Sequence, residues 1–179
     1  MNRKLPCLLV RQPYASLIAY GKKRWELRSY DTKRRGRILI AASRGRPIET
    51  TDETLNRAAT SFPRGVLLAS AQLTESTLVS GLELREKSNF PVKTRIGDIE
   101  FWTADAPVGE PLQDIRTVSP TLQCYAWHLD DVKPLTSAVP LDAKPCSPWT
   151  VVDADIDPRQ GNLASSSGHF FRQLKLSGI

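Results

Sequence analysis

The chain has 179 residues, 40% of them hydrophobic, a length and composition typical of one domain with its own core. Its 25 Lys and Arg outnumber 19 Asp and Glu, so the formal net charge is +6. No apolar run approaches the ~18–20 residues that cross a bilayer, which argues against a membrane protein. Two histidines and three scattered cysteines argue against a metal site and predict a reducing, cytoplasmic location without a cofactor.

The positive charge is concentrated near the N-terminus. Residues 1–46 contain thirteen Lys or Arg and only two acids, Glu26 and Asp31, whereas the remaining residues carry more acids than bases. Such asymmetry is typical of proteins that bind nucleic acid or another polyanion. A patch that only holds phosphates needs no carboxylate, so Glu26 among so many cations suggests a further role.

In chain order, hydrophobic patterns predict strand 5–10, helix 12–20, strand 24–29, strand 37–43, helix 51–62, strand 65–73, and strands 98–102 and 124–129. Residues 75–97 are polar, broken by a proline, and remain ambiguous. In strand 24–29, alternation places Trp25 and Leu27 on one face and Glu26 and Arg28 on the other, which we expect to be an open surface. Several short strands with two or three short helices predict an α+β fold, a small mixed β-barrel.

The C-terminal part differs from the rest in composition. From residue 134 onward the chain contains five prolines and is expected to be extended, followed by a Gly/Ser-rich linker at 161–168. The last residues, 169–179, are predicted to form a short docking helix or to be mobile. We therefore predict one domain over residues 1–150 and an extended tail over 151–179.

Five stretches, in order, resemble the ASCH (activating-signal-cointegrator homology) family. Arg11–Ile18 (RQPYASLI) and Gly21–Arg28 (GKKRWELR) resemble its Gln-Pro-aromatic-Ala helix start and its G-x-K-x-x-E-x-R segment. Residues 35–43, 63–71 and 125–129 resemble its Arg-Gly strand, its Pro-x-Gly strand and its aromatic-x-Trp-x-Leu strand. The resemblance implies a PUA-like fold with a cleft lined by the G-x-K-x-x-E-x-R segment.

The resemblance also implies functions. Members of the family are thought to bind RNA, and some are reported as hydrolases, either ribonucleases or an amidohydrolase that deacylates N4-acetylcytidine. In that amidohydrolase the lysine matching Lys23 is the proposed nucleophile, and a threonine stands where this chain has Glu26. The chain thus departs from the amidohydrolase at a catalytic position.

The residue types of this segment suit either binding or catalysis. A lysine acts as a nucleophile only when its pKa falls well below ~10.4, and Glu26 opposes such a fall in the pKa of Lys23. Arg28 can hold a phosphate through two parallel hydrogen bonds, and Glu26 can accept from a base or act as a general base. The plainer alternative is a surface ion-pair ladder on a strand. Trp25 is expected in the core, whereas the family alignment points Trp127 toward the cleft, where it would stack on a base.

We therefore predict a protein that binds RNA or a nucleotide-like ligand. The alternatives are a hydrolase on RNA or a modified nucleoside, with Lys23 and Glu26 as catalytic residues, and an interaction module for acidic protein partners. The predicted ligand-binding residues are Tyr14, Ser16, Lys23, Glu26, Arg28, Ser43 and Trp127. The predicted contacts to the nucleic-acid backbone are Lys22, Arg24, Lys33, Arg34, Arg35, Arg37 and Arg44. The oligomeric state is left open.

Overall fold

A computed structural model describes residues 2–105, 107–141 and 148–155. Within these ranges the strands are β1 (Asn2–Val10), β2 (Trp25–Arg28), β3 (Gly36–Ala42), β4 (Val66–Ser80), β5 (Val92–Ile96), β6 (Ile99–Thr103), β7 (Gln123–Pro140) and β8 (Trp149–Asp155). The helices are α1 (Tyr14–Ala19), α2 (Glu53–Ala59), α3 (Gly81–Lys87) and α4 (Leu112–Thr117). Every strand and helix that the sequence predicts over residues 5–129 is present, and α3, α4, β5 and β8 are additional.

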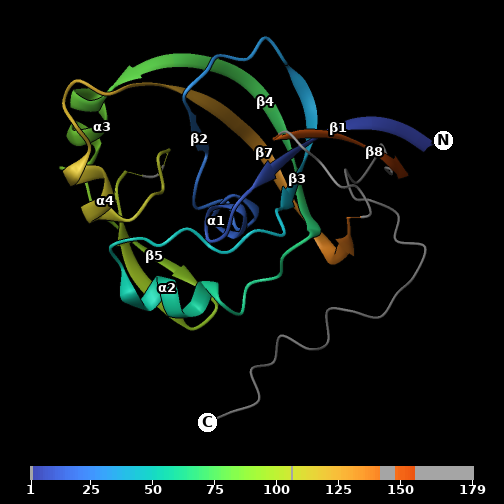
Figure 1. Ribbon diagram of the computed structural model, residues 1–179, viewed down its shortest axis with the longest axis horizontal. Helices are drawn as coiled ribbons and strands as arrows, with labels where there is room; N and C mark the ends of the chain where they lie inside the picture. The colour runs from blue at the N-terminus through green and yellow to red at the C-terminus, as the bar shows by residue number, and fades with distance from the viewer. Residues whose placement is uncertain (1, 106, 142–147, 156–179) are drawn as a thin grey trace.

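The main sheet has six strands in the order β2-β7-β4-β3-β1-β8, and a separate hairpin pairs β5 with β6. Strands β1 and β3 run parallel, whereas the other neighbouring pairs are antiparallel. The α+β class is confirmed. The predicted barrel is not found as a closed structure: β2 and β8 are the two edges, and no pairing between them joins the sheet within the described residues (Figure 1).

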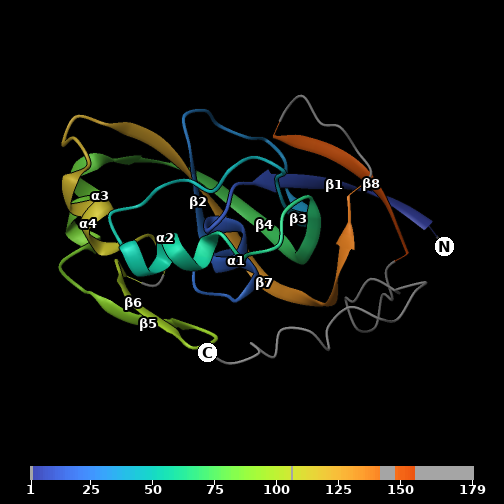
Figure 2. The same cartoon turned by 60° about the horizontal axis from the view of Figure 1, so that its bottom comes forward.

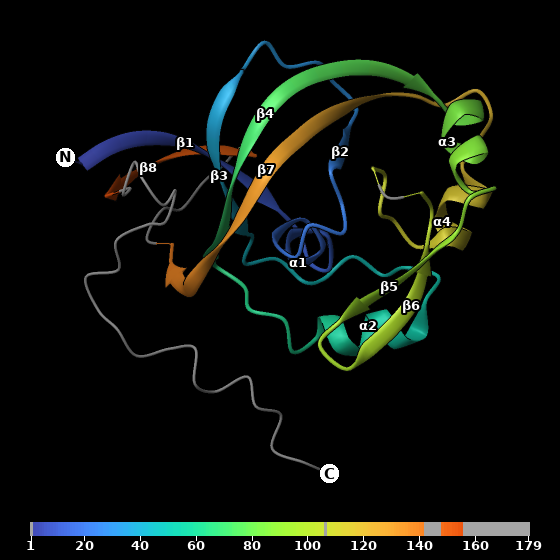
Figure 3. The ribbon, with the colours of Figure 1, turned by 180° about the vertical axis from the view of Figure 1, so that it is seen from behind.

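The sheet arches because its two longest strands are irregular. Strands β4 and β7 have 15 and 18 residues, and their pairing register shifts at three places along β4. Each shift inserts unpaired residues, which bend a strand and increase its twist. Figure 3 shows β4 and β7 curving together from the β3 side of the molecule to α3. This curvature produces a concave face.

Helix α1 lies within that concavity (Figure 1). Its residues Ala15, Ile18 and Ala19 are buried in one hydrophobic cluster with side chains of β1, β3, β4 and β7. The helix ends where the sequence predicts, because Gly21 adopts a φ of +69°, a left-handed conformation that suits glycine at a helix C-terminus. The helix therefore fixes where the chain enters β2.

The helices α2, α3 and α4 and the β5–β6 hairpin build a second layer beside the arch. Helix α2, capped by the Asp52 side chain on the Leu55 amide, packs with the β5–β6 hairpin through Leu55 and Phe101 (Figure 2). Helix α3 begins with a capping box in which Ser80 and Glu83 bond each other's backbone amides. Leu84 of α3 and Ile115 of α4 share a cluster with the outer half of the β4–β7 pair.

The C-terminal predictions are only partly covered. Residues 149–155 form β8, which pairs antiparallel with β1. The predicted linker at 161–168 and the predicted terminal segment at 169–179 lie outside the described residues. Among the described residues, no helix combines the length and the apolar character that a bilayer crossing requires.

Trp127 provides a test of this core. Its side chain is fully buried on β7, whereas Trp102 on β6 is 52% exposed. Trp127→Ala should lower the free energy of unfolding by about 3–5 kcal/mol, because it removes a large buried ring and leaves a cavity. Trp102→Ala, the matched control, should change it by less than about 1 kcal/mol. Equal losses in urea denaturation would contradict the core position of Trp127.

Candidate functional site: buried charges beside an exposed basic loop

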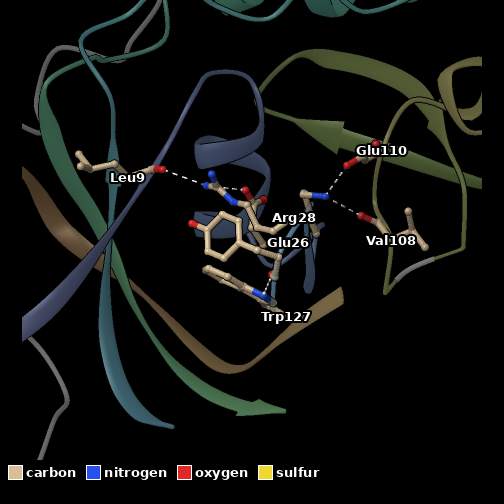
Figure 4. Close-up of polar contacts among 8 residues, drawn as sticks. Leu9, Glu26, Arg28, Val108, Glu110 and Trp127 are labelled. Carbon is tan, nitrogen blue, oxygen red and sulfur yellow. Dashed lines mark hydrogen bonds and ion pairs between the residues drawn. The ribbon is translucent and has the colours of Figure 1, made fainter. Parts of the chain in front are cut away.

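Lys23 is fully buried, although it lies in the most basic segment of the chain. The amides of Lys22 and Lys23 both donate to the Leu17 carbonyl oxygen, which turns the chain back over the end of α1. The Lys23 Nζ then donates to Glu110 Oε1 at 2.7 Å and to the Val108 carbonyl oxygen at 3.3 Å (Figure 4). Burial of an ammonium is tolerated only with such partners.

Close backbone contact holds Glu110 in place. A Cβ on Gly109 would lie 2.2 Å from the Lys22 carbonyl oxygen and 2.6 Å from the Lys23 Cα, and its φ is +62°. Only glycine fits this approach. The Pro107 carbonyl oxygen also accepts from the amides of Arg24 and Trp25, at 2.9 and 2.6 Å. The loop before α4 is thus fastened to the segment that carries Lys23.

Glu26 is also buried, which corrects the prediction that it lies on an open surface. The alternation of faces is as expected, but Glu26 is opposite Trp127 in the β2–β7 register, on the side of the sheet where α1 packs. Burial raises the pKa of the Glu26 carboxyl, nearby Lys23 and Arg28 oppose that rise, and Glu110 adds to it. Its Oε1 lies 2.9 Å from Arg28 Nη2.

Arg28 joins this buried group to the end of β1. Its Nη2 donates to the Leu9 carbonyl oxygen at 3.1 Å, and its guanidinium lies 5.8 Å from the centre of the Trp127 ring (Figure 4). Its Nε is buried and has no hydrogen-bond partner among the residues that the structure describes. The predicted Glu26–Arg28 pair is therefore present, but as a largely buried structure instead of a surface ladder.

Two of the predicted ligand-binding residues, Tyr14 and Ser16, lie on α1. The Lys23 Nζ lies 5.2 Å from the centre of the Tyr14 ring, and burial followed by the Glu110 carboxylate raises the pKa of the Tyr14 hydroxyl. Ser16 is buried, and its amide donates to the side-chain oxygen of Gln12. Gln12 also donates to the Pro63 carbonyl oxygen at 2.7 Å, so the Gln-Pro helix start has a structural role.

Trp127 lies in the core and exposes no indole surface. Trp149 of β8 stacks against it, with ring centres 5.5 Å apart, and the Nε1 of Trp127 donates to the Tyr30 carbonyl oxygen. The structure thus places Trp127 behind Trp149 instead of in an open cleft. Trp25 also packs in the interior, as expected, and contacts His128.

The predicted backbone-binding cations do not form one patch. Lys33, Arg34 and Arg35 are exposed in the loop between β2 and β3, whereas Arg44 is exposed at the other end of β3, about 20 Å away at ~3.3 Å per residue. Lys22 and Arg24 are exposed on either side of the buried Lys23. Arg37 is half-buried and ion-paired with Asp131, so its charge is already neutralised.

The basic loop that spans residues 29–35 has an internal order. Arg35 donates to the carbonyl oxygens of Thr32 and Arg34, and the guanidinium of Arg34 lies 4.9 Å from the centre of the Trp149 ring. Asp31 accepts from Ser76 Oγ and the Thr32 amide, and these bonds help to hold the pKa of its carboxyl below the usual range. The loop thus presents its cations from a defined framework.

Sequence reasoning missed Glu110, Gln12 and Trp149. Glu110 follows a stretch without periodicity and has no pattern that would pair it with Lys23, 87 residues earlier. No group of three or more His, Cys, Asp or Glu side chains in the described part of the chain is arranged to hold a metal ion.

The family model described as the ASCH domain matches residues 8–102. The chain belongs to the ASCH domain family. Two mutants of ZmASCH from Zymomonas mobilis, each a crystal structure, superpose on this ASCH protein with a TM-score of 0.51 at 18% identity. The alignments cover 84% of this chain and 91% and 89% of theirs, a likeness that shows the shared fold alone. No curated protein sequence matches significantly.

The pair Lys23–Glu110 can be tested by a double-mutant cycle. Glu110→Gln should lower the free energy of unfolding by about 3 kcal/mol, because it leaves a buried ammonium without its counter-charge. The added substitution Lys23→Met should recover most of that loss. The exposed pair Lys93–Glu100, at 2.6 Å, is the matched control, and the same changes there should cost less than about 1 kcal/mol. A small loss at both pairs would contradict a structural role for the buried pair.

Proposed function

We propose that this ASCH protein binds RNA through its basic loop at residues 29–35 and the adjoining Trp149. This loop carries three exposed cations, and its Asp31 carboxylate accepts hydrogen bonds from the Ser76 hydroxyl and the Thr32 amide. Family membership supports an association with nucleic acid. The charge asymmetry of the chain supports the same conclusion.

The observation that carries the proposal is the Arg34–Trp149 contact. The Arg34 guanidinium carbon lies 4.9 Å from the centre of the Trp149 ring, so this contact combines the two kinds of group on which unpaired bases stack. Lys33 and Arg35 stand on either side of Arg34 in the sequence, and both are exposed, so a phosphate can reach them. An interface for acidic proteins needs the charges alone, so the aromatic partner favours single-stranded RNA.

Charge reversal tests this surface. In the double variant Arg34→Glu/Arg35→Glu, affinity for a fluorescent single-stranded RNA should fall at least tenfold, and the dependence of affinity on salt should become shallower. Each phosphate contact releases about 0.7 counter-ions from a single strand, so lost contacts reduce that slope. The control Lys93→Glu/Arg95→Glu on the β5–β6 hairpin changes the net charge equally and should bind RNA more tightly than the loop variant. Equal losses would place RNA binding elsewhere or make it a matter of net charge.

A hydrolase is a second candidate, because a buried carboxyl with a raised pKa beside two cations is typical of acid–base sites. Lys23 suits the role of nucleophile poorly: its Nζ is fully buried and donates to Glu110. Among the predicted catalytic residues, Glu26 is therefore the better candidate for proton transfer.

Product analysis distinguishes the two candidates. We expect wild-type protein to release no product from acylated cytidine or RNA. We expect Glu26→Gln to bind RNA as tightly as wild type, because the Glu26 side chain is buried. Turnover in wild type that disappears in Glu26→Gln, with RNA affinity unchanged, would establish the hydrolase instead.

A further inference from the structure

A second cluster of arginines lies at the opposite end of β3 from the basic loop. Strands β1 and β3 are parallel, so the segments that follow them, Arg11 after β1 and residues 43–46 after β3, emerge at the same edge of the sheet. The Ser43 amide donates to the Val10 carbonyl oxygen, which holds the two segments together. Ligands of α/β sheets commonly bind outside the carboxyl ends of parallel strands.

Arg11 and Ser43 both lie close to Gly45 in this cluster. The Ser43 Oγ is buried and has no hydrogen-bond partner within the described residues, which is unusual for a hydroxyl group. A Cβ on Gly45 would lie 3.8 Å from the Ser43 Oγ and 3.8 Å from the Arg11 Nε. Glycine at this position therefore keeps any side chain away from the Ser43 hydroxyl and from the Arg11 side chain.

Hydrogen bonds to backbone carbonyl oxygens hold Arg11 and Arg44 of this cluster in place, and no described carboxylate neutralises the cluster. Arg11 donates through Nε and Nη2 to the Arg46 carbonyl oxygen, at 3.0 and 2.7 Å, and Arg44 donates to the Leu141 carbonyl oxygen at 2.6 Å. Within the described ranges, no carboxylate forms an ion pair with Arg11, Arg44 or Arg46. Within the described residues, three arginines without an ion pair thus lie on the two segments that carry the unpartnered Ser43 hydroxyl.

We propose that Arg11, Ser43 and the residue 44–46 loop form a binding site for a phosphate group. A tetrahedral oxyanion accepts from several donors at once, so it would satisfy the Ser43 hydroxyl and neutralise the surrounding arginines. The proposal deepens the RNA-binding function: the phosphate would belong to an RNA strand that also contacts the basic loop, at the far end of β3. Free phosphate or a mononucleotide offers the same chemistry.

The decisive variant is Gly45→Ala. A methyl group there meets both donors at ordinary contact distance, and the backbone φ of Gly45 is not in the left-handed region, so the variant should fold normally. It places a methyl group within 3.8 Å of both the Arg11 Nε and the Ser43 Oγ. Ser43→Ala removes the hydroxyl donor alone.

The probe is inorganic phosphate, titrated by calorimetry and by amide chemical shifts at constant ionic strength against chloride. Wild type and the Arg34→Glu/Arg35→Glu variant should bind phosphate equally. Binding should weaken at least about tenfold in Ser43→Ala, because a hydrogen bond to a charged group is lost, and disappear in Gly45→Ala. Absence of phosphate binding in wild type, or equal binding in wild type and Gly45→Ala, would overturn the site.

RNA binding by wild type and by Gly45→Ala identifies the source of the phosphate. If phosphate binds in a Gly45-dependent manner and Gly45→Ala also weakens RNA binding, the occupant is an RNA phosphate. If phosphate binds in that manner while RNA binds neither protein, the site stands as one for free phosphate or mononucleotides, and the proposed RNA-binding function fails. The two proposals are therefore tested separately.

Discussion

Burial of the Lys23 ammonium is the constraint on which the site depends. An unpaired ammonium in the interior costs several kcal/mol, so the loop before α4 must deliver Glu110 to it, at 2.7 Å. That delivery requires Gly109, because any side chain there would collide with the backbone of Lys22 and Lys23. The pair therefore ties a loop from the second layer to the start of β2 and fixes the strand that carries Glu26 and Arg28.

One basic segment consequently serves two purposes. Lys23, Glu26 and Arg28 point inward, where their charges satisfy one another and the carbonyl oxygens of Leu9 and Val108. Their neighbours Lys22 and Arg24 remain exposed. The cations available to a ligand lie farther along, on the 29–35 loop at one end of β3 and around residues 43–46 at the other. Strand β3 thus separates these two exposed basic surfaces.

Local patterns predicted the elements whose signals are local. Pro13 and Gly21 bracket α1, and alternation gave the correct faces of Trp25 and Glu26. The inward side could not be inferred, because β7 and α1 decide it. The capping box Ser80-x-x-Glu83 does lie in the sequence and would have located α3. Glu110 and Trp149 could not be found, since their partners, Lys23 and Trp127, are far away in sequence and meet only after the sheet has formed.

We propose that RNA lies along the β3 side of the molecule, over the basic loop and Trp149. The most direct measurement is the mapping of amide and indole chemical shifts in the labelled protein as single-stranded RNA is added. RNA bound along this side should cause saturable changes in chemical shift at residues 29–35, at the Trp149 indole and at residues 43–46. The β5–β6 hairpin should show none. Shifts centred on the hairpin, or an unperturbed Trp149, would contradict this proposal.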